Sequence, residues 1–191
     1  MFLKILENYS SVKKATEDTI YKRERPYLSK RRSEMKLNEE IEILSYCLMP
    51  DHYHLLVWQK HEDGITKLLR RVVTSYVMYF NQRFKRSGSL FENVYRAVLV
   101  EDEQQILELS KYIHVNPVSR QVRRFGLVET NSGIAPEYYM YSSYKNYLSG
   151  DDGPIIKTGK IKNLVKSGSY KDFMDLPKPN WEIILGGLLL E

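Results

Sequence analysis

The alternation of apolar and polar positions divides the first half of the chain into a helix, a pair of strands and a second helix. Apolar residues recur at three-to-four spacing in 1–20, which predicts a helix, whereas 22–38 are charged and predict a surface loop. Two β-prone runs, 41–48 and 52–58, flank a Met-Pro-Asp turn and predict a hairpin. In 65–84 apolar residues return at helical spacing, which predicts a long helix with arginines on its outer side.

The next segment predicts one more strand and one more helix. Residues 96–101 (RAVLVE) predict a third strand. Asp102 can cap the helix that follows, and we expect this helix to end near Asn116, because Pro117 disfavours a helical conformation in the residue before it. This order of elements is typical of an α/β (α+β) sandwich in which helices pack on an antiparallel sheet.

Composition favours a soluble, packed protein of one domain with an appendage. The 191 residues are 42% hydrophobic and 28% charged, unlike disordered or membrane proteins. We expect one domain in 1–125 and a C-terminal extension with short helices in 126–191. Cys47 is the single cysteine, which excludes an internal disulfide and favours the cytoplasm. The apolar tail 181–190 is much shorter than the ~20 residues that cross a bilayer, so no membrane partner is expected.

Positive charge is concentrated in the first 100 residues, which hold 18 Lys and Arg against 12 Asp and Glu, compared with 11 against 12 in the rest. The 15 tyrosines offer ring faces on which unpaired bases can stack. Charge and aromatics together favour a single-stranded nucleic acid partner, although a solvated surface carries similar charge. The basic residues expected to bind nucleic-acid phosphates are Arg23, Arg25, Arg31, Arg32, Lys67, Arg70, Arg71, Arg83, Lys85 and Arg86.

Two histidines stand two residues apart on the second predicted strand. Side chains at this spacing share one face, so His52 and His54 can converge on one divalent metal ion. Such a pair leaves the coordination shell open. On the last predicted helix, Tyr112 and Asn116 lie four residues apart and share a face. The Asn116 amide oxygen suits Mg²⁺ or Mn²⁺, and Tyr112 would lie beside the same ion.

Structural roles stay open for these residues. A lone His-x-His also arises among surface or core histidines, and a helical tyrosine often lines the edge of a core. His114 is a competing ligand, but helical spacing points it away from Tyr112 and Asn116. A histidine-triad hydrolase would need a third alternating histidine, and position 56 is leucine.

Five short segments follow one another in a specific order. They are 49–57 (MPDHYHLLV), 88–91 (GSLF), 96–100 (RAVLV), 112–118 (YIHVNPV) and 141–144 (YSSY). In this order they resemble the REP-associated tyrosine transposases and their insertion-sequence relatives, the IS200-like single-tyrosine HUH transposases. The likeness covers roughly residues 1–150.

The resemblance implies an RRM-like antiparallel sheet backed by helices. His52 and His54 would be the two HUH metal ligands, Asn116 the third ligand and Tyr112 the nucleophile. The implied protein is a transposase that acts as a metal-dependent endonuclease and strand transferase, with Mg²⁺ or Mn²⁺ as its metal. It would cut single-stranded DNA by transesterification, through a 5′-phosphotyrosine intermediate. Its partner would be single-stranded or hairpin DNA, and a homodimer is compatible with the resemblance.

The chain departs from the family's pattern in several places. Position 51 is Asp where Asn is usual, position 94 is Val where Arg is common, and position 141 is Tyr where Trp is common. We also expect the chain to lack the family's first strand, ahead of the helix that opens at Phe2, which would expose a sheet edge. Two alternatives follow: a catalytically inactive truncated relative that binds hairpin DNA, and an RRM-like RNA-binding module, whose strand signature is missing.

Overall fold

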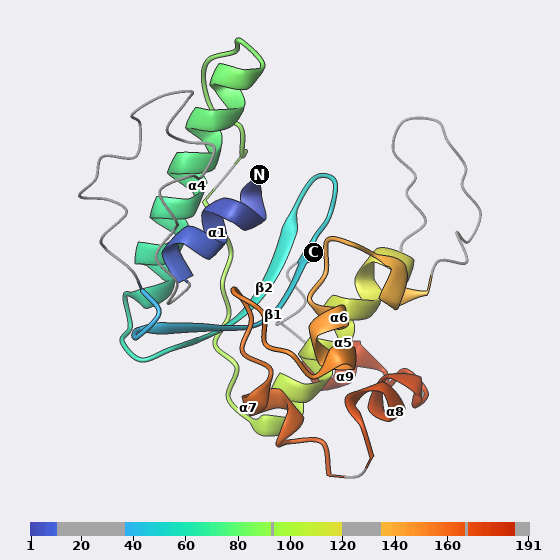
Figure 1. The fold of residues 1–191 in the computed structure, drawn as a ribbon. Helices are drawn as coiled ribbons and strands as arrows, with labels where there is room; N and C mark the ends of the chain where they lie inside the picture. Colours follow the sequence, from blue (N-terminus) through green and yellow to red (C-terminus); the bar gives the residue numbers. More distant parts are fainter. Residues whose placement is uncertain (11–36, 93, 120–134, 167, 186–191) are drawn as a thin grey trace. The chain divides into compact units, whose positions relative to one another are not determined.

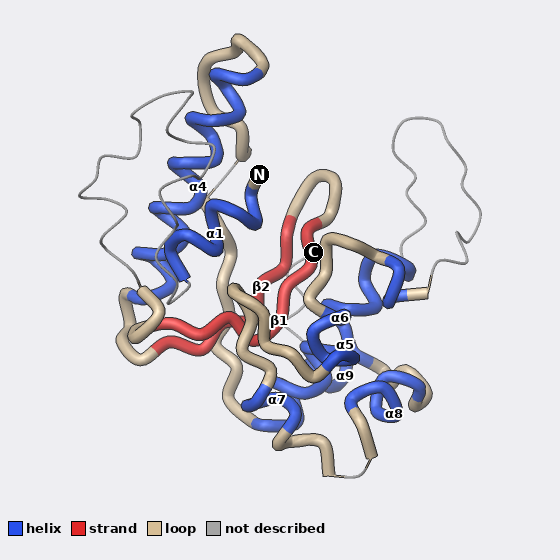
Figure 2. The backbone as a smooth tube through the Cα atoms, viewed as in Figure 1, coloured by secondary structure: helices blue, strands red, loops and turns tan. Residues whose placement is uncertain are grey.

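The computed structural model describes residues 1–10, 37–92, 94–119, 135–166 and 168–185 (Figure 1). In chain order the elements are α1 (Phe2–Ser10), β1 (Ile41–Leu48), β2 (Tyr53–Gln59), α4 (Gly64–Arg83), α5 (Glu103–Ser119), the 3₁₀ helix η1 (Pro136–Tyr138), α6 (Tyr144–Ser149), α7 (Gly159–Lys162), α8 (Tyr170–Asp175) and α9 (Trp181–Leu185). The strands β1 and β2 form a two-stranded antiparallel sheet, and the remaining elements are helices (Figure 2). The predicted α+β class with C-terminal helices is therefore confirmed.

The described chain divides into two compact units, residues 1–42 with 57–95 and residues 43–56 with 96–191. In the first unit α1 packs against α4. The buried side chains are Phe2, Ile5, Leu6 and Tyr9 of α1 and Leu68, Leu69 and Val72 of α4. The Phe2 and Tyr76 rings meet edge to face with centroids 5.2 Å apart, and the Tyr9 and Ser75 hydroxyls form a 3.0 Å hydrogen bond. The periodicity in the sequence therefore marks the faces that these helices bury.

In the second unit, segments from the C-terminal region cover the edge of β1 that β2 leaves open. The backbone N–H of Lys157 donates to Ile43 O at 2.8 Å, and that of Ser143 donates to Tyr46 O at 3.0 Å. At the end of β1 the N–H of Leu48 donates to Tyr141 O at 2.9 Å. These bonds satisfy backbone groups that an open strand edge would leave to water.

Helix α5 runs through Pro117 to Ser119, so the prediction that it ends near Asn116 is wrong. Pro117 lies in the last turn, where its missing N–H removes one hydrogen bond and the helix needs to continue for only two more residues.

One face of α5 is anchored in the core. The ammonium of Lys111, with the residue only 1% exposed, donates to the carbonyls of Phe173 at 3.0 Å and Leu176 at 2.7 Å.

The predicted strand over residues 96–101 is also wrong. These residues form neither helix nor strand, and the side chains before and within the segment are exposed, with Val94 at 86% and Leu99 at 79%. A strand needs a neighbouring strand to satisfy its backbone, and the sheet in the described residues has only β1 and β2. High β-propensity alone does not supply that partner.

The remaining expectations have mixed outcomes. The loop predicted over 22–38 falls almost wholly outside the described residues. The short helices expected in 126–191 correspond, in the described residues, to η1, α6, α7, α8 and α9. Within the ranges that the structure describes, no helix combines the length and the apolar character needed to span a bilayer.

Cys47 is fully buried, and burial raises the pKa of its thiol to about 12, so this thiol stays protonated and unreactive.

Candidate functional site

The two histidines of the His-x-His motif face each other at the start of β2. The Nε2 atoms of His52 and His54 lie 3.1 Å apart, with the rings nearly perpendicular. Two ligands at 90° on one ion, each at about 2.1 Å, would be about 3.0 Å apart. The backbone N–H of Met49 donates to His52 O at 2.9 Å and closes the turn that brings His52 to this position. The pair therefore has the spacing of two metal ligands.

Asp51 fixes the orientation of the first imidazole. Its Oδ1 lies 2.7 Å from His52 Nδ1. An ionised carboxylate only accepts hydrogen bonds, so His52 Nδ1 donates. The lone pair of neutral His52 is therefore on Nε2, the atom that faces His54. A carboxylate in this position is a common outer partner of metal-binding histidines.

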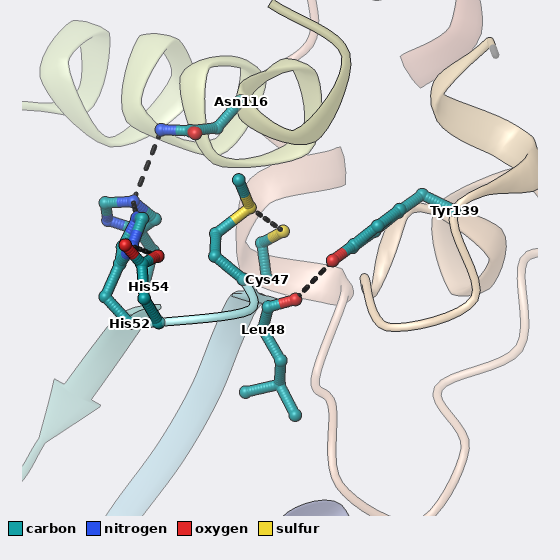
Figure 3. A network of polar contacts seen from close by, with 8 residues as sticks. Cys47, Leu48, His52, His54, Asn116 and Tyr139 are labelled. Carbon is teal, nitrogen blue, oxygen red and sulfur yellow. Dashed lines mark hydrogen bonds and ion pairs between the residues drawn. The ribbon is translucent and has the colours of Figure 1, made fainter. Parts of the chain in front are cut away.

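Asn116 reaches the histidine pair from α5. Figure 3 shows its side chain extending from the helix toward His54. The residue is only 4% exposed, and its Nδ2 lies 3.2 Å from His54 Nε2. Its Oδ1 is buried without a hydrogen-bond partner. An orphaned buried carbonyl of this kind costs free energy unless some other group contacts it.

The hydrogen-bonding capacity of these three side chains does not balance. If the amide of Asn116 donates to His54 Nε2, the lone pairs of His54 and His52 face each other at 3.1 Å. If His54 Nε2 carries a proton and donates to His52, the Asn116 amide has no acceptor there. These conflicts hold for the amide as placed: a half-turn brings Oδ1 to the same position, where it can accept from a protonated His54 Nε2 or contact a cation that both imidazoles also reach. The residues therefore fit a divalent metal.

Tyr112 lies on the same side of α5 as Asn116, one turn earlier. Its ring is edge to face with that of His54, with centroids 6.1 Å apart. On another side it meets the ring of Trp181 at 5.1 Å. The fold of a single chain therefore places the four predicted site residues next to one another, namely His52, His54, Tyr112 and Asn116.

His114 belongs to the core. It is fully buried, and its Nε2 lies 2.7 Å from the hydroxyl of Ser143, while its Nδ1 lies 2.9 Å from that of Tyr170. Burial lowers the pKa of His114 to about 3, so the ring is neutral. Its partners explain why it does not join the histidine pair.

The basic residues predicted to contact DNA are divided by the structure. Arg23, Arg25, Arg31 and Arg32 lie outside the described residues. Lys67 pairs with Glu40 at 3.1 Å and with Asp63 at 3.0 Å. The hydrogen bond to Asp63 has the larger effect, and together with the one to Glu40 it raises the pKa of the Lys67 ammonium. Arg70, Arg83, Lys85 and Arg86 are exposed on or just after α4, and Arg71 is half-buried there. Phosphate binding by these residues stays a prediction.

Sequence reasoning missed two contributors to the site. At Asp51 the family pattern indicates only an unusual residue, although an acid next to a histidine pair is itself a signal for an orienting hydrogen bond. No pattern in the sequence links Trp181 to the site, because it is 69 positions after Tyr112 and only the packing of α9 against α5 brings the two residues together. Within the described residues no three His, Cys, Asp or Glu side chains form a metal-binding cluster, because the third donor here is an amide.

Comparison with protein families gives a match. The family described as "Transposase IS200 like" matches residues 11–116, a segment that includes the histidine pair and Tyr112 and ends at Asn116. No curated protein and no solved structure matches the chain. Since the matched segment is more than half of the 191 residues, the chain belongs to the family of IS200-like transposases.

Proposed function

We propose that this transposase-like protein is a metal-dependent endonuclease and strand transferase for single-stranded DNA. The observation that carries the proposal is the approach of the two Nε2 atoms to 3.1 Å beside the orphaned Oδ1 of Asn116. Two imidazole nitrogens at ligand spacing, beside a buried amide whose oxygen has no hydrogen-bond partner, favour a bound cation, and a tyrosine stands next to them. Tyrosine oxygen is a nucleophile in covalent catalysis, and phosphate is the group that a cation would hold here.

In this proposal His52, His54 and Asn116 hold Mg²⁺ or Mn²⁺. When bound, the ion polarises the scissile phosphate and offsets negative charge on its oxygens. The Tyr112 oxygen loses its proton to solvent and bonds to phosphorus, while the bond from phosphorus to the 3′ oxygen breaks and that oxygen takes up a proton. The 5′ phosphate stays on Tyr112. A second DNA 3′-hydroxyl can reverse this exchange, and no ATP is needed because a phosphate ester replaces a phosphate ester.

The chain should form a covalent adduct with single-stranded DNA. We would incubate it with oligonucleotides from both strands of the DNA flanking its coding sequence, with Mg²⁺ or Mn²⁺, and separate the products on denaturing SDS gels. A 3′ label is expected to move to a protein-sized band, and a 5′ label to a shortened free strand. Binding without any adduct would identify an inactive DNA-binding relative. A protein-bound 5′ label would contradict the polarity.

Metal binding is tested without any DNA. Titration of Mn²⁺ by calorimetry should give one site per chain, and His54→Ala should weaken it at least ~100-fold, because loss of even an outer partner costs 10–100-fold. His61→Ala is the matched control, since His61 is exposed in the turn before α4. Equal affinities in His54→Ala and the parent chain would rule out this donor set.

A further inference from the structure

A C-terminal tryptophan contacts the proposed nucleophile. The Trp181 and Tyr112 rings meet at an interplanar angle of 88° with centroids 5.1 Å apart. This is the edge-to-face arrangement that aromatic pairs prefer. Trp181 lies outside the segment that matches the transposase family, which ends at residue 116. The contact therefore joins the matched segment to the C-terminal region that follows it.

The indole ring is itself held in place. Its Nε1–H donates to Glu108 Oε2 at 3.4 Å, and Glu108 lies one turn before Tyr112 on α5. Trp181 thus bridges two consecutive turns of the same helix, by a hydrogen bond on one and by a ring contact on the other. A ring fixed at two points restricts the rotation of its neighbour more than a ring fixed at one.

The helix that carries Trp181 is anchored on both sides. Before it, the Leu176 carbonyl accepts a 2.7 Å hydrogen bond from Lys111 of α5. At its start the Asn180 Oδ1 accepts from the backbone N–H of Glu182 at 3.1 Å. At its end Leu185 is buried, with 2% exposure. The Asn180 bond caps the helix locally, while the bond from Lys111 to Leu176 and the contacts of α9 along α5 place the helix against α5.

We propose that Trp181 is a positioning residue, which holds the Tyr112 ring so that its hydroxyl faces the phosphate held beside His54. This inference rests on the proposed function. The two rings that border Tyr112, those of Trp181 and His54, leave its side chain little choice of rotamer. Removing the indole frees the phenol to leave the attack position, while the residues that bind DNA and metal remain.

The test compares Trp181→Ala, Trp181→Phe and Leu176→Ala. Leu176 is the matched control, because its side chain is 57% exposed and only its backbone is used as an anchor. At saturating DNA, Trp181→Ala should form adduct at least ~10-fold more slowly, because a displacement of about 1 Å can cost ~100-fold. The affinity for DNA should stay unchanged. Trp181→Phe, which keeps a ring, should recover most of the rate.

A second measurement is independent of activity. Nitration of Tyr112 by tetranitromethane, followed by mass spectrometry, should be faster in Trp181→Ala than in the parent chain and unchanged in Leu176→Ala. If the parent chain forms no adduct at all, the proposed function fails and this role fails with it. If the parent forms adduct and Trp181→Ala matches it in rate, or nitration does not change, only the positioning role is overturned.

Discussion

Replacement of Tyr112 by phenylalanine is expected to abolish adduct formation completely. The change removes one oxygen atom, the only atom of this side chain that can bond to phosphorus. The ring remains, and with it the contacts to His54 at 6.1 Å and Trp181 at 5.1 Å. Folding and DNA affinity should therefore stay as in the parent chain, as measured by thermal unfolding and by fluorescence anisotropy with a labelled oligonucleotide.

Tyr138→Phe provides the control for this substitution. It deletes the same hydroxyl from a tyrosine that is 71% exposed in η1, and its adduct yield should match that of the parent. A Tyr112→Phe variant that still becomes linked to DNA would assign the nucleophile to another residue. Peptide mapping of that adduct would then identify the residue.

Acidification is expected to destabilise the protein through His114. The folded state keeps this ring neutral, with a pKa of about 3, whereas the ring in the unfolded chain titrates near 6.5. Between these values the unfolded state binds one proton that the folded state does not, so the free energy of unfolding falls as the pH falls. The loss approaches 1.4 kcal/mol per pH unit and amounts to about 2 kcal/mol between pH ~6.5 and ~4.5.

Urea unfolding at these two pH values measures the effect. In His114→Gln the titrating group is absent, so its stability should change by about 2 kcal/mol less than that of the parent chain over the same interval. Contributions from the other histidines cancel in this difference. In parallel, the His114 ring signals in the NMR spectrum of the parent should not titrate above pH ~4. Equal pH dependence of both proteins, or a His114 signal that titrates near pH 6, would contradict a neutral buried ring.

The parts of this fold that the sequence predicts correctly are those set by local pattern. The apolar spacing of 65–84 and the two β-prone runs around the turn correspond to α4, β1 and β2 within one or two residues. The predicted strand at 96–101 fails because pairing depends on a distant partner rather than on propensity. The predicted α5 is too short because a proline such as Pro117 is tolerated in the final turn of a helix.

The candidate site also has parts that local spacing predicts and parts that depend on long-range packing. The approach of His52 and His54 follows from a two-residue spacing, and the shared face of Tyr112 and Asn116 follows from a four-residue spacing. Neither spacing could place α5 over the start of β2, which depends on long-range packing. The contact between Trp181 and Tyr112 depends on it too, and for that reason no local pattern indicated it.

Helix α5 uses residues two positions apart for opposite tasks, and this restricts how its gene can change. His114 faces the core between Ser143 and Tyr170, while Tyr112 and Asn116 face the histidine pair. One added residue early in the helix would rotate everything after it by about 100°. Both sets of contacts would be lost together, so a single in-frame codon insertion there would disrupt the fold and the candidate site at once. The irregular segment 96–101 just before α5 holds no such register, so we expect a change of its length to be tolerated better.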